Sequence, residues 1–501
     1  MPDFAHRQCH AGTMPRWGSR FMERSTLSPS LAARRIAFSD RDGRSDPPFP
    51  PFCRWHLRLS PLLRFVFHDL RVESDARLTA VALAATISAV VIAAPDGTQV
   101  RGQIDRDTVW SGRLEVTGDV VVASDATLTL NPGTRVAFAN GARLTVHGRL
   151  LAEGTEKRPV TLTARGELQR GAWHGIVLAP QPDGTDEILP EGSRLSACRI
   201  KGAVHTVWVV ASASSAHGVA SCQITRCRQT GVWLDGIRGA QIANNQITQC
   251  GSVDHRPSGA ILVHRSGRCQ VKDNSIQGCA AYRIGLLQST DNTVRGNTIE
   301  DIDGRKRKPD GFGISLSTAS NRNLVLSNHV RGINYMCLYV GDSAGNLIID
   351  NELRNSPDGL GMTGPTTTGN IVRRNRIYGS WWGQIYITSS AHDNLVQDTT
   401  VTGGDAGITL WASGPNTFEN CVFHGTGPIA LLGTSKALFR HCTIRLGVGA
   451  NDLSTEFESS CELIDCNVRK DHIGFSKGTT DKSQIVFKRT LTVKVVDSES
   501  G

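Results

Sequence analysis

The sequence lacks the short motifs that mark zinc, redox or metalloprotease chemistry. It has no Cys-x-x-Cys pair, no His-Glu-x-x-His segment and no His-rich or Met-rich stretch, although 13 Cys and 15 His are present. These absences argue against a transition-metal site. Charged residues make up 20% of the chain and hydrophobic residues 39%, and 51 residues are Gly. Such a composition is typical of a globular, turn-rich chain rather than a disordered one.

Long apolar runs are scarce, and the clearest one stands near the N-terminus. Residues 1–76 are rich in Arg and Pro, and we expect a disordered or mis-assigned N-terminal extension there. Arg77 precedes an apolar run from Leu78 to Ala94, which predicts a signal peptide at 77–94 or, alternatively, an uncleaved membrane anchor. Export predicts a secreted, periplasmic or cell-surface protein, with 95–107 as a linker.

From about residue 195 onward the chain repeats itself at steps of 21 to 31 residues, most often 23 or 24. One column of the repeat holds Asn, followed two residues later by an aliphatic residue. A second column lies five residues earlier, and a third is a Gly followed by an alternating apolar strand. Three columns in register over a dozen repeats predict a solenoid. The first column includes Asn245, Asn274, Asn297, Asn328, Asn351 and Asn375.

The composition of each unit distinguishes between kinds of solenoid. The Leu-rich pattern of leucine-rich repeats is missing, whereas short β-branched strands separated by Gly, Asn and Asp turns are present. We therefore predict an all-β, parallel β-helix of about 14 rungs over 108–485, with strands about 4.8 Å apart. The aliphatic residue after each Asn should point inward. Asn suits the corners because it tolerates the left-handed conformation and its amide can bond to the next rung.

The C-terminal residues 486–501 leave two interpretations open. They include the alternating segment Leu491-Thr-Val-Lys-Val-Val-Asp. This segment fits a last capping strand of the solenoid, and it also resembles the first strand of an Ig-like module that the chain truncates.

The segment 108–178 resembles the N-terminal rungs of exported right-handed parallel β-helix proteins of the pectin-lyase-like superfamily. The resemblance extends over roughly 108–470 and implies a right-handed β-helix. That superfamily contains lyases, hydrolases, epimerases and non-catalytic surface proteins, so the activity stays open. The matching residues are Gly118-Asp119-Val120, Leu128-Thr129-Leu130, Pro132-Gly133-Thr134, Leu150-Leu151-Ala152-Glu153-Gly154-Thr155, Pro159-Val160 and Trp173.

Catalytic motifs of the superfamily are absent. The chain has no Asn-Thr-Asp or Asp-Asp sequence of a polygalacturonase-like site, so its single Arg-Ile-Lys, at 199–201, stands without the carboxylates of that site, and it has no Asp-Pro-His-Glu of an alginate-epimerase-like site. No family's catalytic residues can therefore be carried over to this sequence.

Cysteines occupy the columns of the repeat. Cys227, Cys250 and the Cys residues of the Asn columns are expected to be buried, ladder-like thiols. Stacking on neighbouring rungs would also let Cys421–Cys442 or Cys227–Cys250 oxidise outside the cell.

Two repeats are long, and their extra residues fall at the same corner. The inserts 251–258 and 301–310 are separated by one repeat, so they should flank one side of the solenoid about 10 Å apart. Arg283 lies between them in the Gly column. A cationic cluster at this corner would bind carboxylates or sulfates, and the alternative is a solvated charged loop. Its members are His255, Arg256, Arg283, Arg305, Lys306, Arg307 and Lys308.

Aromatic residues occupy outward places of the Gly-strands. Trp233, Tyr339, Tyr386 and Trp411 are candidates for stacking on sugar rings, and the alternative is that they pack beneath loops.

Carboxylates recur at the corner before the Gly-strand. Asp310, Asp358 and Asp405 could supply an acid–base pair, oxygen ligands for Ca²⁺, or plain turns. We assign Asp358 and Asp405 to turns and favour Asp310, beside the basic insert, for catalysis. The catalytic candidates are Asp310, His255, Arg283 and Lys308, and the substrate-binding candidates are Arg256, Arg305, Lys306, Arg307 and the four aromatic residues.

The net charge of +9 favours acidic partners. The first hypothesis is an enzyme acting on an acidic, uronate-type polysaccharide: a polysaccharide lyase, a glycoside hydrolase or a C5 epimerase. In elimination or epimerisation, Arg or Lys would neutralise the uronate carboxylate while His255 or a lysine removes the α-proton. The alternative is a non-catalytic cell-surface or structural glycan-binding protein.

Other partners are less favoured. Nucleic-acid binding rests on net charge alone and conflicts with the export signal. We expect a monomer that needs no cofactor, with Ca²⁺ as an option, and that meets a membrane only through Leu78 to Ala94 if that run is uncleaved.

Overall fold

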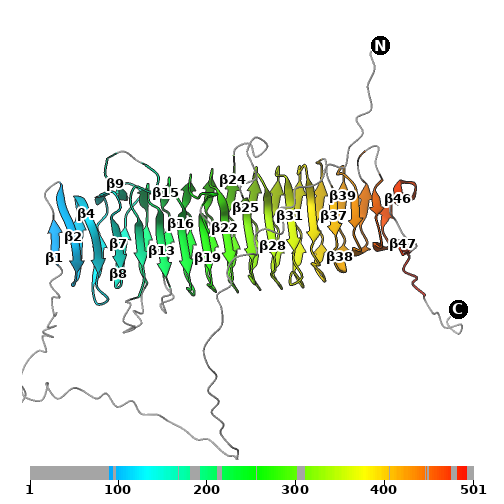
Figure 1. Ribbon diagram of the computed structural model, residues 1–501, viewed down its shortest axis with the longest axis horizontal. Helices are drawn as coiled ribbons and strands as arrows, with labels where there is room; N and C mark the ends of the chain where they lie inside the picture. Colours follow the sequence, from blue (N-terminus) through cyan, green and yellow to red (C-terminus); the bar gives the residue numbers. More distant parts are fainter. Residues whose placement is uncertain are drawn as a thin grey trace, which may run out of the picture. The chain divides into compact units, whose positions relative to one another are not determined.

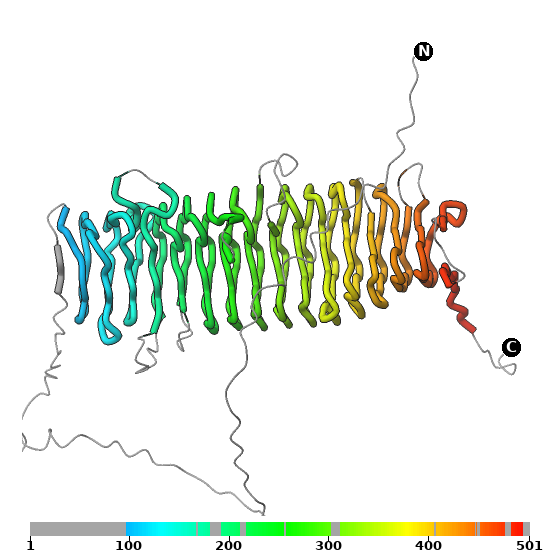
Figure 2. Tube along the Cα trace, viewed as in Figure 1, coloured from blue at the N-terminus to red at the C-terminus, as the bar shows by residue number. Residues whose placement is uncertain are grey.

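The described chain forms a coil of short parallel strands. The computed structural model describes residues 90–93, 97–166, 169–180, 192–210, 217–254, 257–301, 311–404, 407–445, 447, 451–475 and 482–493. All of them belong to the compact unit Ala84–Gly501, and the other unit, Met1–Leu83, lies outside the described residues. Figure 1 shows the strands stacked side by side, and Figure 2 shows that the chain adds one circuit after another in sequence order.

Each circuit, here called a rung, contributes three strands. In one rung these are β17 (Gln241–Ala243), β18 (Gln246–Thr248) and β19 (Gly259–His264). Each pairs in parallel with the strand three positions later, so that Ile247 lies opposite Ile276. The prediction of an all-β parallel solenoid is confirmed. A single turn of 3₁₀ helix, Lys470–His472, is the one helical element of the described residues.

The strands form three columns. Column A is β1 (Val90–Ala93), β3 (Thr108–Ser111), β5 (Thr127–Leu130), β8 (Arg149–Glu153), β11 (Arg194–Ser196), β14 (Gly218–Ala220), β17, β20 (Gln270–Lys272), β23 (Thr293–Arg295), β26 (Leu324–Leu326), β29 (Leu347–Ile349), β32 (Ile371–Arg373), β35 (Leu395–Gln397), β38 (Asn416–Glu419), β41 (Lys436–Arg440), β44 (Ser460–Ile464) and β47 (Gln484–Lys488). Column B is β6 (Arg135–Phe138), β9 (Val160–Ala164), β12 (Cys198–Lys201), β15 (Gln223–Thr225), β18, β21 (Ser275–Gln277), β24 (Thr298–Glu300), β27 (His329–Arg331), β30 (Glu352–Arg354), β33 (Arg376–Tyr378), β36 (Thr400–Thr402), β39 (Val422–His424), β42 (Thr443–Arg445) and β45 (Asn467–Val468). Column C is β7 (Arg143–Val146), β10 (Gly175–Leu178), β13 (His205–Val210), β16 (Thr230–Asp235), β19, β22 (Ala281–Leu287), β25 (Gly311–Ser317), β28 (Met336–Gly341), β31 (Asp358–Thr363), β34 (Gly383–Thr388), β37 (Ile408–Trp411), β40 (Ile429–Leu432), β43 (Leu453–Thr455) and β46 (Ile473–Phe475), while β2 (Thr98–Ile104) and β4 (Arg113–Val122) span columns B and C.

The core is a set of stacked aliphatic rows. Val271, Ile276 and Ile284 come from the three strands of one rung and are all fully buried. Burying one such side chain contributes about 1.5–3 kcal/mol, and each lies directly over its counterpart on the next rung. The expectation that the residue two places after the ladder Asn points inward is confirmed.

Asparagine ladders hold neighbouring rungs together. The Asn274 amide donates to Asn297 Oδ1 (2.9 Å) and to the Ile242 carbonyl (3.0 Å), so the expected rung-to-rung amide bond is confirmed. The left-handed conformation falls on the residue before the ladder position, such as Asp273 (φ 56°) or Arg374 (φ 53°). The expectation that the ladder Asn itself takes this conformation is therefore wrong. The corner reverses one residue earlier and leaves the amide free to point along the stack.

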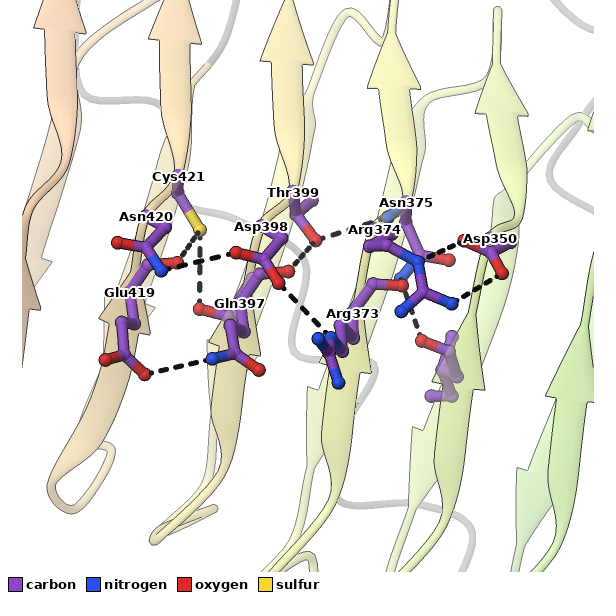
Figure 3. A network of polar contacts seen from close by, with 12 residues as sticks. Asp350, Arg373, Arg374, Asn375, Gln397, Asp398, Thr399, Glu419, Asn420 and Cys421 are labelled. Carbon is purple, nitrogen blue, oxygen red and sulfur yellow. Dashed lines mark hydrogen bonds and ion pairs between the residues drawn. The ribbon is translucent and has the colours of Figure 1, made fainter.

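Next to the asparagine ladder, charged side chains at the same corner link neighbouring rungs by ion pairs. Arg374 donates to both carboxylate oxygens of Asp350 at 2.8 Å, and Arg373 donates to Asp398 at 3.2 Å (Figure 3). These exposed pairs join adjacent rungs and contribute about 0–1 kcal/mol each.

The described cysteines are free thiols, and the expectation of buried ladders holds for ten of the eleven. Cys227 and Cys250 lie with their sulfur atoms 2.7 Å apart on successive rungs. Cys442 and Cys466 also occupy successive rungs, where Cys442 is buried and Cys466 is partly exposed.

Two boundaries of the solenoid differ from the expected ones. Residues 95–107, expected to be a linker, contain β2, which pairs with β4. At the other end β47 pairs with β44 and crosses the expected boundary at 485/486. The expected extension 1–76 lies outside the described residues, as does the 77–94 segment except for the backbone of β1, which pairs with β3. Within the described residues no helix has the length and apolar character to span a membrane.

Candidate functional site

The outer side of column C carries a cluster of aromatic side chains. Phe312 stacks on Tyr339 with ring centroids 4.6 Å apart and on Tyr282 at 5.9 Å, and it meets Tyr335 at a tilt at 5.3 Å. In β28 the neighbours of Tyr339 point inward and are fully buried, whereas Tyr339 is half-buried. We call the surface formed by Tyr282, Phe312, Tyr335, Met336, Tyr339, Asp358 and Tyr386 the aromatic face.

Asp358 is the acidic residue of this face. It begins β31, its backbone N–H donates to the Tyr335 carbonyl (3.0 Å), and the residue as a whole is only 9% exposed. Burial raises the pKa of its carboxyl to about 7. Within the described part of the chain the carboxyl oxygens have no hydrogen bond or ion pair. A buried carboxylate is normally paired, so its isolation marks a candidate functional group.

The phenols around Asp358 stay protonated near neutral pH. Burial raises the pKa values of Tyr335, Tyr339 and Tyr386 above the ordinary value for tyrosine, and the nearby Asp358 carboxylate adds to the effect on Tyr335 and Tyr386. These hydroxyl groups can therefore donate hydrogen bonds to a bound ligand.

Glycines in the strands of column C leave space for the large side chains of the aromatic face. A Cβ at Gly361 would collide with Met336, and one at Gly341 would collide with the Tyr339 ring. At Gly383 a Cβ would lie 3.0 Å from Asp358 Oδ1. The carboxyl of Asp358 thus extends toward the next rung, above Gly383 and beside Tyr386.

A second aromatic group lies earlier in column C. Trp208 and Trp233 stack with centroids 4.9 Å apart and an angle of 12° between their planes. His205 packs against both rings, and burial lowers its pKa to about 4, with smaller contributions from His174 and Arg228. It is therefore neutral at neutral pH.

The four aromatic residues singled out from the sequence all come from column C. Trp233 is half-buried against Trp208, whereas Tyr339 and Tyr386 are half-buried on the aromatic face. Trp411 is 44% exposed at the end of β37, in register with Thr388.

Arg283 does not lie where an exposed carboxylate clamp was expected. Its side chain is 1% exposed, its guanidinium pairs with the buried Asp301, and it donates to the Ala281 carbonyl (3.2 Å). The Gly column explains this difference, because its residues point into the interior at the corner between columns B and C. Cys337 and Gln384, at equivalent places, are also fully buried. Arg283 therefore serves the core of the solenoid.

The remaining sequence candidates lie outside the described residues. The anchors of their inserts are described: 251–258 leads into β19, and 301–310 leads into β25. Gly259 pairs with Tyr282, and Gly311 pairs with Ala281, so the inserts join column C on either side of β22. The candidates concerned are His255, Arg256, Arg305, Lys306, Arg307, Lys308, Asp310 and Asp405.

Column B has a depression of its own, of about 310 Å³, and its charges are paired. Arg331 contacts Glu300 at 2.6 Å, and the Tyr378 hydroxyl donates to Glu352. That hydrogen bond is the main cause that lowers the pKa of Glu352. No group of three His, Cys, Asp or Glu side chains among the described residues is arranged to hold a metal ion.

A family model identifies the class of protein to which this fold belongs. The family model "Right handed beta helix region" matches residues 187–351 and 312–466, more than half of the chain. The chain belongs to this family, and its resemblance to right-handed parallel β-helix proteins is confirmed. No curated protein sequence matches it.

Solved structures of similar fold include three carbohydrate-active proteins. The periplasmic alginate epimerase AlgG is 13% identical, with 76% of each chain covered and a TM-score of 0.38. The A-module of the mannuronan C-5 epimerase AlgE6 from Azotobacter vinelandii is 10% identical, with 78% of this chain and 91% of that one covered and a TM-score of 0.35. The catalytic unit of a GH87 α-1,3-glucanase from Streptomyces thermodiastaticus is 13% identical, with 80% and 69% covered and a TM-score of 0.38.

Proposed function

We propose that this protein is exported and binds an acidic, uronate-type polysaccharide along the outer side of column C. The observation that carries the proposal is the aromatic face, where Phe312, Tyr339 and Tyr386 lie half-buried beside the isolated carboxyl of Asp358. Aromatic rings supply apolar contact area to the faces of sugar rings, while phenol hydroxyls supply hydrogen-bond donors.

The geometry of the stack suits an extended ligand better than a small one. Tyr339 and Tyr386 lie at the same register position two rungs apart, which corresponds to about 10 Å along the stack. Trp208 and Trp233 lie at that position on earlier rungs. A polymer running along column C would meet aromatic surface at several separate points.

Preference for an acidic polymer rests on charge. The chain carries +9 overall, and its inserts 251–258 and 301–310 join column C on either side of the strand that bears Tyr282. Arg256, Arg305 and Arg307 in these inserts suit two-pronged hydrogen bonding to carboxylates, and Lys306 and Lys308 add positive charge.

Binding to column C is tested by removing its aromatic rings. Tyr339→Ala and Tyr386→Ala in the full chain should each weaken the affinity for polygalacturonate or alginate by about 5–10-fold, roughly 1–1.4 kcal/mol. Tyr378→Ala is the matched control, because Tyr378 lies on column B. Isothermal titration calorimetry measures the affinities. Equal losses for all three variants, or no binding by the wild type, would contradict the proposal.

The preference for an acidic polymer is tested at the longer insert, 301–310. Replacing Arg305, Lys306, Arg307 and Lys308 by Ala should weaken binding to uronate polymers and reduce its salt dependence, since exposed charge contacts are screened by salt. Binding to a neutral glucan should change little. Parallel losses on both polymers would remove the anionic part of the proposal.

Export is tested separately by sequencing the N-terminus of the mature protein. A start near residue 94 or 95 is the result expected for a cleaved signal peptide. A chain that retains the run from Leu78 to Ala94 would contradict cleavage.

A further inference from the structure

The outer side of column A carries an apolar stripe. On four successive strands, β26, β29, β32 and β35, the middle residue is buried in the core and the residue before it is an outward-facing Leu or Ile. Two of these strands place a second aliphatic side chain outward. All of these side chains are at least partly exposed, and contiguous apolar surface of this kind marks interaction sites. The stripe consists of Leu324, Leu326, Leu347, Ile349, Ile371 and Leu395.

Polar residues bound the stripe at both of its ends. On the preceding strand, β23, the equivalent outward places hold Thr293 and Arg295. On the following strand, β38, they hold Thr417 and Glu419. One end of the stripe is therefore basic and the other acidic.

Charged residues also border the two long edges of the stripe. At the corner before column A, Arg322 and Asp393 precede the ladder Asn on the first and last rungs of the stripe, and both are exposed. At the corner after column A, Asp350 and Arg374 hold equivalent places on the two middle rungs (Figure 3). An apolar centre within a polar rim is the usual anatomy of a protein–protein interface.

We propose that two copies of this chain associate face to face through the outer sides of column A, with their solenoids antiparallel. The twofold axis runs along the strand direction between β29 and β32. Leu347 then packs against the partner's Ile371, and Leu324 packs against the partner's Leu395. The inference does not depend on sugar binding, and it replaces the monomer expected from the sequence.

Charge complementarity selects a second copy as the occupant of this surface. The twofold axis sets β23 against the partner's β38, so Arg295 meets the partner's Glu419. It also sets Arg322 opposite the partner's Asp393. Each contact occurs twice, because the same patch is used by both copies.

The middle rungs add a further pair of contacts. Asp350 lies opposite the partner's Arg374, which extends the ion pair within each copy into a group of four alternating charges. An axis along the solenoid would instead set each rung against itself and would form none of these contacts. The antiparallel arrangement is therefore the favoured one.

The size of the contact indicates a weak, reversible dimer. The six rungs from β23 to β38 span about 29 Å along the stack, and the face is about 17 Å wide from corner to corner. Together the two copies bury about 1,000 Å², which is near the lower limit for specific association. On the next rungs Lys272 would face the partner's Arg440, so like charges limit the contact to these six. We expect a micromolar dissociation constant.

The first test is sedimentation equilibrium of the full chain over a range of concentrations. Leu347→Asp should weaken association by about tenfold or more, because it places two carboxylates in the apolar centre of the contact. Val422→Asp is the matched control and should leave association unchanged. Leu347 is 39% exposed on column A, and Val422 is 40% exposed at an outward place of column B. Circular dichroism establishes that both variants fold.

The second test exchanges charges across the proposed contact. Arg295→Glu and Glu419→Arg should each weaken association about fivefold, and the double variant should recover the wild-type affinity. Within one copy the two residues lie five rungs, about 24 Å, apart, so recovery requires that they meet between copies.

Three outcomes would overturn the inference. The first is a wild type that stays monomeric up to about 1 mM, far above a micromolar dissociation constant. The second is a dimer that Leu347→Asp and Val422→Asp weaken equally, which would place the contact elsewhere. The third is a double charge variant that associates no better than either single variant.

Discussion

Replacing Asp358 by Asn should stabilise the folded protein at neutral and alkaline pH but not in acid. In the native state Asp358 is 9% exposed and its carboxyl has no ion pair among the described residues, whereas unfolding releases the carboxyl into water. Its pKa is therefore about 7 in the folded chain against an ordinary value of 3.8. Asn keeps the shape of the side chain and removes the charge.

The magnitude and sign follow from linkage. Below the ordinary value both states are protonated, and the group has no pH-dependent effect. As the pH rises from about 4 to about 7, the Asp358 carboxyl ionises in the unfolded state but stays largely protonated in the folded state. The free energy of unfolding of the wild type therefore falls progressively over this range. A difference of about 3 pKa units corresponds to about 4 kcal/mol, which is fully developed above about pH 7.

The assay is thermal unfolding of both proteins across this pH range. The buried amide carries its own desolvation penalty at every pH, so the informative quantity is the change in the difference between variants. For a solenoid of this size about 4 kcal/mol shifts the midpoint by about 5 °C. If the difference in unfolding midpoint between the wild type and Asp358→Asn stays constant from about pH 4 to about pH 8, the inference that Asp358 carries an isolated, buried carboxyl is refuted.

Other predictions concern the interior. Asn351→Ala should destabilise the protein by about 3 kcal/mol in urea unfolding, because it leaves ladder N–H and carbonyl groups of adjacent rungs without partners. Under oxidising conditions Cys227 and Cys250 should form a disulfide that adds about 3 kcal/mol; titration of the denatured protein should then find two thiols fewer, and Cys227→Ser should abolish that difference. Arg283→Ala should cost about 3–5 kcal/mol by stranding Asp301, whereas Arg283→Met combined with Asp301→Leu should recover most of the loss.

Each of these interior predictions has an outcome that contradicts it. The ladder argument fails if Asn351→Ala is no more harmful than Asn355→Ala, which changes an exposed residue at the adjacent corner. Unchanged thiol counts after oxidation would show that the two sulfur atoms do not approach in solution. A double variant as unstable as Arg283→Ala would mean that the buried charges are not the source of the loss.

The repeat made the stacking predictable from the sequence. Two columns of Asn and one of Gly identify equivalent positions on successive rungs, and equivalence along the sequence becomes contact in a solenoid. The pairing of Ile247 with Ile276 and the amide bond from Asn274 to Asn297 follow directly from that rule. Strand β2 was not predicted from the sequence because it lies in a part of the chain where the repeat is not yet regular.

The candidate site was less predictable, because burial depends on side chains from other rungs. Arg283 stands in the Gly column, whose inward direction is set by the corner geometry and has no local sequence signal. Asp358 belongs to Pro-Asp-Gly, which is a turn signal in any sequence. Its isolation comes from Tyr335 and Tyr386, each more than 20 residues away along the chain.

Glycine decides where the large side chains of the aromatic face can lie. In register, Tyr339, Gly361 and Tyr386 follow one another on successive rungs, and Met336 lies across the space that Gly361 leaves. Asp358 in turn extends over Gly383 toward the rung of Tyr386. The surroundings of Asp358 therefore come from three successive rungs, and any shift in strand register would separate the carboxyl from the phenols at the same time as it broke the core rows beneath them. The proposed sugar-binding surface and the packing of column C therefore depend on the same alignment.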